Sequence, residues 1–94
     1  MEEKVFRIRF DAIPCGPSAP GEHAIILVGL RDGATPQIFK ISWPVFRDRL
    51  ISILGFSVTR AFELDKVISA TDRIIMEPIE ATMRQLQALG FEGI

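Results

Sequence analysis

The chain has 94 residues, 48% of them hydrophobic, and a formal net charge of −1 at pH 7. This length predicts one small domain covering residues 1–94, and the hydrophobic content favours a folded chain over disorder. With 11 basic and 12 acidic residues, the chain lacks the basic excess of a general nucleic-acid binder, so we expect no nucleic-acid partner. The mean hydropathy of +0.26 is high for a small protein and suggests that a second copy or a partner covers apolar surface.

The N-terminal residues MEEKVFRIRF contain no apolar stretch of the kind found in secretory signal peptides. The longest apolar run, residues 24–28, has the length of a strand and is too short to cross a membrane. Cys15 is the only cysteine, so no intramolecular disulfide can form. We therefore expect a cytoplasmic protein that makes no membrane contact.

Residues 4–12 alternate between apolar and polar side chains, which predicts a β-strand with one face on the core. Residues 13–22 hold three prolines and two glycines, and they predict a loop. The loop is long for a hairpin, so it is either a plain connector or a functional segment.

Residues 23–30 are apolar on both faces, which is typical of a central strand that is covered on both sides. Residues 31–33, Arg-Asp-Gly, predict a turn, and alternation resumes over residues 37–42. The simplest topology is a three-stranded antiparallel meander of residues 4–12, 23–30 and 37–42.

The third predicted strand leads directly into a predicted helix over residues 43–54. Ser42 is the expected N-cap, Pro44 fits the first turn, and Gly55 fits the position just after the last turn. Trp43 stands at the junction, where we expect it to pack over the seam between sheet and helix.

The sequence of residues 56–77 allows two secondary structures. A helix over residues 59–76, capped by Thr59, is favoured by an apolar stripe. A hairpin of residues 66–70 and 73–77 is the alternative, because valine and isoleucine are frequent there. Residues 78–89 predict a final helix opened by Pro78. The fold class is therefore α+β, with two or three helices packed on one face of the meander.

The uncovered face of the sheet is the candidate interface. We expect it to carry Arg7, Arg9 and Lys40 beside one apolar row of the second strand, Ile25 and Leu27. This pattern predicts a non-catalytic interaction or regulatory module, homodimeric or bound to a protein partner.

The sequence is compatible with two other functions. A small-ligand protein would place its pocket between sheet and helices near Trp43, gated by the loop 13–22. An enzyme would use Cys15 and His23, which flank that loop, but the sequence offers no third residue to orient them. No metal site is expected from a single His and a single Cys, and no cofactor from a chain without phosphate-binding glycine motifs. Asp65 and Asp72 are interpreted as part of a solvated helix face.

Overall fold

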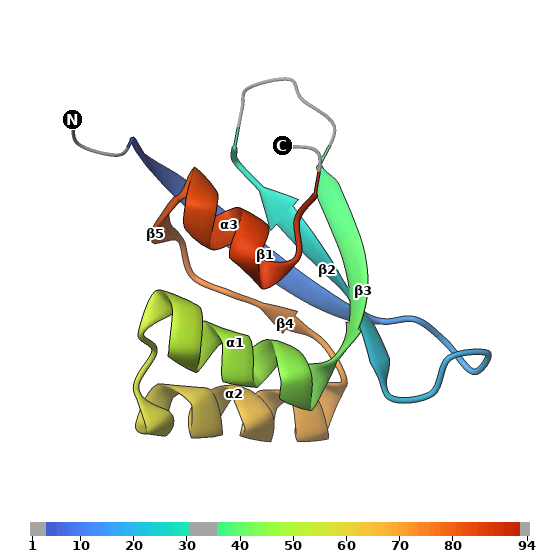
Figure 1. Cartoon of the computed structure of the whole chain (residues 1–94). Coiled ribbons are helices and arrows are strands. Elements are labelled where there is room, and N and C mark those ends of the chain that lie inside the picture. The colour runs from blue at the N-terminus through green and yellow to red at the C-terminus, as the bar shows by residue number, and fades with distance from the viewer. Residues whose placement is uncertain (1–3, 31–35, 93–94) are drawn as a thin grey trace.

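The computed structural model describes residues 4–30 and 36–92, and within them the fold is α+β, as predicted (Figure 1). The chain order is β1-β2-β3-α1-α2-β4-β5-α3. The strands are β1 (Val5–Pro14), β2 (Glu22–Val28), β3 (Gln37–Ser42), β4 (Ile74–Ile75) and β5 (Ile79–Thr82). The helices are α1 (Trp43–Leu54), α2 (Val58–Thr71) and α3 (Met83–Leu89).

The sheet is antiparallel, and its strand order is β3-β2-β1-β4, with β5 also paired to β1. The predicted meander is thus confirmed, but two further strands extend it. One edge of β1 pairs with β2, whereas the other edge pairs first with β5 and then with β4. The turn predicted at residues 31–33 lies outside the described residues.

Helix α1 begins and ends where the sequence predicts. Ser42 is the N-cap residue, as predicted, although its hydroxyl makes no capping hydrogen bond. Gly55 adopts a left-handed conformation with φ 72°, and its N–H donates to the carbonyl of Ile51 at 3.1 Å. This bond closes the last turn, and the absence of a Cβ lets glycine adopt the required φ.

Residues 58–71 form helix α2, which confirms the helical interpretation over the hairpin. The cap is Ser57 instead of Thr59, and its Oγ accepts from the N–H of Arg60 at 3.1 Å. Asp72 ends the helix with φ 60°, so the predicted continuation to residue 76 was wrong. Beyond this left-handed residue the chain turns extended and forms β4 against β1.

The predicted helix from Pro78 starts too early. Residues 79–82 form β5, in register with residues 5–8 of β1. Helix α3 begins only after Thr82, which forms a capping box with Gln85. A capping box satisfies two backbone N–H groups at once and fixes the helix start there.

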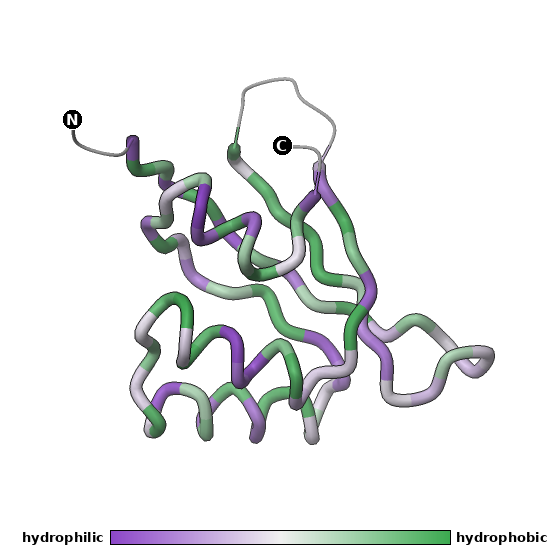
Figure 2. Tube along the Cα trace, in the orientation of Figure 1, coloured by the Kyte–Doolittle hydropathy of each residue, from purple (hydrophilic) through white to green (hydrophobic). Residues whose placement is uncertain are grey.

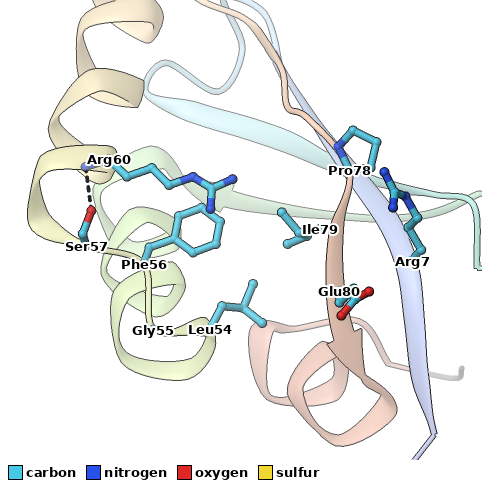
Figure 3. A pocket seen from close by; sticks show the side chains of 9 residues that line it. All are labelled: Arg7, Leu54, Gly55, Phe56, Ser57, Arg60, Pro78, Ile79 and Glu80. Atoms are coloured by element: carbon cyan, nitrogen blue, oxygen red, sulfur yellow. Dashed lines mark hydrogen bonds between the residues drawn. The ribbon is translucent and has the colours of Figure 1, made fainter.

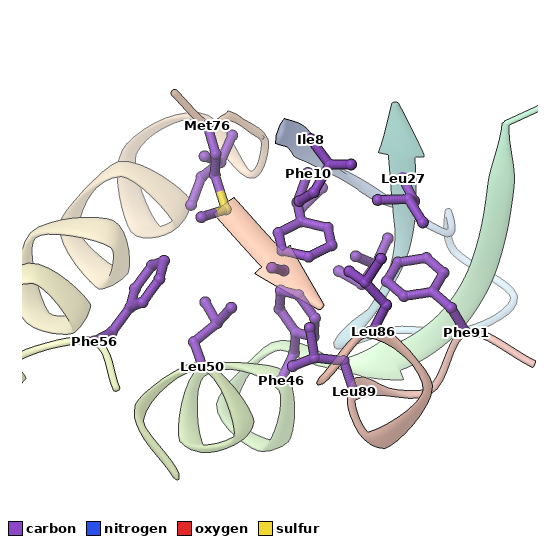
Figure 4. Close-up of a cluster of buried hydrophobic side chains, with 14 of the residues drawn as sticks. Ile8, Phe10, Leu27, Phe46, Leu50, Phe56, Met76, Leu86, Leu89 and Phe91 are labelled. Carbon is purple, nitrogen blue, oxygen red and sulfur yellow. The ribbon is translucent and has the colours of Figure 1, made fainter. Parts of the chain in front are cut away.

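The core lies between the sheet and helices α1 and α3 (Figure 4). Its centre is a group of aromatic rings: Phe10 stands edge-on to Phe46 at 5.8 Å and stacks on Phe91 at 5.7 Å. Phe39 joins them, with its ring centroid 4.7 Å from that of Phe91. β2 is hydrophobic along most of its length (Figure 2), yet only one of its two rows is in this core. The helices therefore cover one face of the sheet and leave the other uncovered.

Candidate functional site

The uncovered face of the sheet, called the open face below, is built by side-chain alternation. Phe10 of β1 and Ile25 of β2 point to the helices. Successive side chains alternate along a strand, so the residues next to each of them point away. One cross-strand row of the open face runs Ile38, Ile26, Asp11, Ile75 through the β3-β2-β1-β4 register. The apolar side chains of the open face are Val5, Ile13, Ala24, Ile26, Val28, Ile38 and Ile75.

Several of these side chains are well exposed. Ile38 is 59% exposed and Ile75 is 74% exposed, at opposite ends of the same row. Isolated exposed apolar residues are ordinary on a protein surface, but a contiguous set on one sheet face indicates an interaction site.

Charged groups of both signs surround this apolar set. At its centre Arg9 Nε lies 3.1 Å from Asp11 Oδ1, an ion pair along one strand. The basic residues of the open face are Arg7, Arg9 and Lys40, and the acidic ones are Asp11, Glu22 and Glu80. The open face is thus apolar and nearly balanced in charge.

Three of the predicted interface residues, Arg7, Arg9 and Lys40, lie on the open face. The two predicted apolar residues do not: Ile25 is 0% exposed and Leu27 is 1% exposed, and both belong to the core. The opposite row of β2 faces outward. The strand is apolar on both sides, so its sequence does not distinguish the covered row from the open one.

Trp43 packs over the junction between sheet and helix, as the sequence indicates. It is 5% exposed, and its ring lies 6.0 Å from Phe46 and 6.4 Å from His23 of β2. Its indole N–H donates to Asp65 Oδ1 of α2 at 2.7 Å. Trp43 does not line the cavities of about 560, 440, 420 and 350 Å³, and a ligand pocket near this residue stays a prediction.

Asp65 is therefore a packing residue, not part of a solvated face. Its second oxygen, Oδ2, accepts from Arg47 Nη1 at 3.1 Å, so one carboxylate joins α2 to two residues of α1. Arg47 also donates to Asp48. The hydrogen bond to Asp48, followed in size by that to Asp65, raises the pKa of the Arg47 guanidinium above its ordinary value. The Asp65 carboxylate thus ties α2 to α1 through hydrogen bonds from Trp43 and Arg47, the second of them charge-assisted.

His23 and Asp72 form a second link. His23 Nε2 lies 3.0 Å from Asp72 Oδ1, and the side chain of His23 is only 6% exposed. A carboxylate only accepts, so the proton of a neutral ring is on Nε2. Nδ1 is then a buried acceptor that has no hydrogen-bond partner among residues 4–30 and 36–92. The pair fastens β2 to the end of α2, beside a cavity of about 420 Å³ under the Pro/Gly loop.

Cys15 is half-buried, and among the described residues no hydrogen bond joins it to His23. Asp72 is the third residue that could orient His23, and the sequence alone did not identify it. However, the other ring nitrogen of His23, Nδ1, is buried in the protein. A general base needs its lone pair within reach of the proton that it removes. The geometry therefore favours a structural role for the His23–Asp72 pair.

Residues 4–30 and 36–92 contain no group of three or more His, Cys, Asp or Glu side chains placed to bind a metal ion. Within the same ranges no helix has the length and hydrophobicity needed to cross a membrane. Comparison of the chain with protein-family models, curated proteins and solved structures gives no match.

Proposed function

We propose that the chain is a non-catalytic interaction module of the cytoplasm that forms a homodimer through the open face. The observation that carries the proposal is the cross-strand row in which Ile38, Ile26 and Ile75 share one uncovered sheet surface. Burial of apolar surface is the main favourable term in association. A second copy on the open face would remove its apolar side chains from water.

A second copy of the same chain fits this face better than a strongly charged partner does. The open face carries three basic and three acidic side chains, given above, around its apolar row. In a two-fold interface the same patch meets itself, so residue i contacts j and j contacts i. A patch with charges of both signs can pair each cation with an anion of the other copy. A partner with charges of one sign would place like charges opposite half of the charged side chains.

The placement of His23 supports a regulatory or assembly role over a catalytic one. His23 is engaged by Asp72 and packs beside Trp43, so the hypothesised Cys15–His23 pair has no exposed base. The lone thiol fits a reducing compartment, where disulfides are rare.

The test compares two aspartate substitutions at exposed apolar positions. Ile38→Asp places a charge inside the proposed interface, and Val58→Asp places the same charge on α2, where the side chain is 74% exposed. A desolvated, unpaired charge costs about 3 kcal/mol or more, so Ile38→Asp should weaken dimerisation at least about a hundredfold. Val58→Asp should leave the dimer unchanged.

Sedimentation equilibrium measures both dissociation constants, and circular dichroism checks that both variants keep the native helix and strand content. Ile75→Asp, at the other end of the same row, should repeat the effect of Ile38→Asp. A dimer that tolerates both substitutions on the open face would refute the assignment of the interface to it.

A further inference from the structure

A cavity of about 560 Å³ lies between β5 and the connection from α1 to α2 (Figure 3). Leu54 at the end of α1, Phe56 of that connection and Ile79 of β5 supply apolar walls. Arg60 approaches from α2, and Arg7 approaches from the opposite side, beyond β5 (Figure 3). Small-molecule sites usually have about 300–1,000 Å³, so the cavity has the size of one.

The position of Arg60 is fixed by two contacts. Its backbone N–H donates to Ser57 Oγ at 3.1 Å, which ties the residue to the first turn of α2. Its guanidinium carbon lies 4.0 Å from the ring centroid of Phe56, and that ring is 8% exposed. A cation over an aromatic face is attracted to it, so the guanidinium is held above the cavity before any ligand arrives.

Neither arginine has an acidic partner among the described residues. Other arginines are engaged: Arg9 pairs with Asp11, Arg47 pairs with Asp65, and Arg49 donates to the carbonyl of Leu89. Arg7 and Arg60 form no ion pair and donate no side-chain hydrogen bond within the part of the chain that the structure describes.

One acidic residue, Glu80, also lines the cavity. It stands opposite Arg7 in the β1–β5 ladder, yet no ion pair joins the two side chains. Two guanidinium groups against one carboxylate leave an excess of positive charge. Low-dielectric walls on one side of the cavity strengthen the attraction of that charge for an anion.

We propose that this cavity binds a small organic anion. Its phosphate or carboxylate group binds the guanidinium of Arg60, because a guanidinium matches the oxygens of either group in bidentate geometry, and Arg7 adds positive charge from the far side of β5. Its apolar body lies against Leu54, Phe56 and Ile79. Ile38 and Ile75 of the open face do not line the cavity, whereas Arg7 and Glu80 belong to both the cavity and the open face.

The test is a ¹H–¹⁵N NMR titration of the full chain with phenyl phosphate, with benzoate as the carboxylate probe and benzyl alcohol as the uncharged one. Phenyl phosphate should shift the amides of residues 54–57, Arg60 and Ile79. Arg60→Gln should raise the Kd about tenfold or more, because it removes a charge-assisted hydrogen bond. Arg73→Gln, at an exposed arginine outside this cavity, is the matched control and should leave the Kd unchanged.

Glu80→Gln should change the Kd in the opposite direction. It removes a carboxylate that competes with the ligand for the arginines, so the Kd should fall several-fold. Arg7→Gln is the second charge deletion if Arg60→Gln does not fold. If benzoate binds with the same affinity as phenyl phosphate, the natural ligand can carry either a carboxylate or a phosphate. Both results fit the proposal. The proposal is overturned if millimolar phenyl phosphate causes no shifts, if the shifts map elsewhere, or if benzyl alcohol binds equally well.

Discussion

Replacing Phe46 with alanine removes the ring around which the core is assembled. Phe46 is 0% exposed, and its ring centroid lies 5.8 Å from that of Phe10 and 6.0 Å from that of Phe39. Truncating a buried phenylalanine costs about 3–5 kcal/mol, from a total stability of about 5–15 kcal/mol for a domain. In a urea titration with a slope of about 2 kcal/mol per molar, the midpoint should fall by about 2 M.

Phe62→Ala is the matched control, because it makes the same chemical change on the solvent side of α2. Phe62 is 60% exposed, and the Lys66 ammonium lies 5.1 Å from its ring centroid. The expected loss is below about 1 kcal/mol. Both titrations use one protein concentration, because dimerisation adds to apparent stability. Equal losses at the two positions, or a loss below about 1.5 kcal/mol for Phe46→Ala, would refute the assigned core.

The remaining predictions concern backbone positions that end helices. Gly90→Ala should cost about 2–4 kcal/mol in urea unfolding, because φ is 133° and a Cβ would lie 2.9 Å from the Phe39 ring. Gly55→Ala, at φ 72° with open space around it, should cost only about 1–2 kcal/mol, so equal losses would remove the steric argument. Asp72→Asn should change stability by less than about 0.5 kcal/mol, since asparagine still accepts from His23 and tolerates φ 60°. Asp72→Ala loses both properties and should cost about 2–3 kcal/mol, and a loss no larger than that of Asp72→Asn would show that the link is unimportant.

The part of the fold that was predicted to the residue is β3 with α1. Strand alternation, a proline in the first turn and Gly55 after the last turn are all local signals, and they agree with one another here. The end of α3 at Leu89 also agrees with the predicted bound, and the N–H of Phe91 donates to the carbonyl of Leu86 as in a Schellman ending.

β5 was missed because its four residues owe their extended conformation to pairing with residues 5–8 at the other end of the chain. Pro78 also imitates a helix start, because proline is common in a first turn. One local feature marks the true start of α3. Thr82 and Gln85 have the spacing of a capping box, and this spacing identifies the N-cap from the sequence alone.

The candidate sites were less accessible from the sequence. The choice between the two rows of β2 depends on which face the helices cover, and that contact is not local. The cavity joins Arg7 of β1 to Arg60 of α2, and the His23–Asp72 pair likewise joins distant segments. Only the finished topology places these residues together, so no spacing rule could have identified them.

The central claim is the homodimer, and the most direct measurement is the mass of the unmodified chain in solution over a dilution series. Light scattering on a gel-filtration column, with native mass spectrometry beside it, should give twice the 10.5 kDa of one chain at the higher concentrations. On dilution the mass should fall towards that of one chain, as for a reversible two-fold interface. A mass of one chain at every concentration would contradict the account, because the open face would then remain in water.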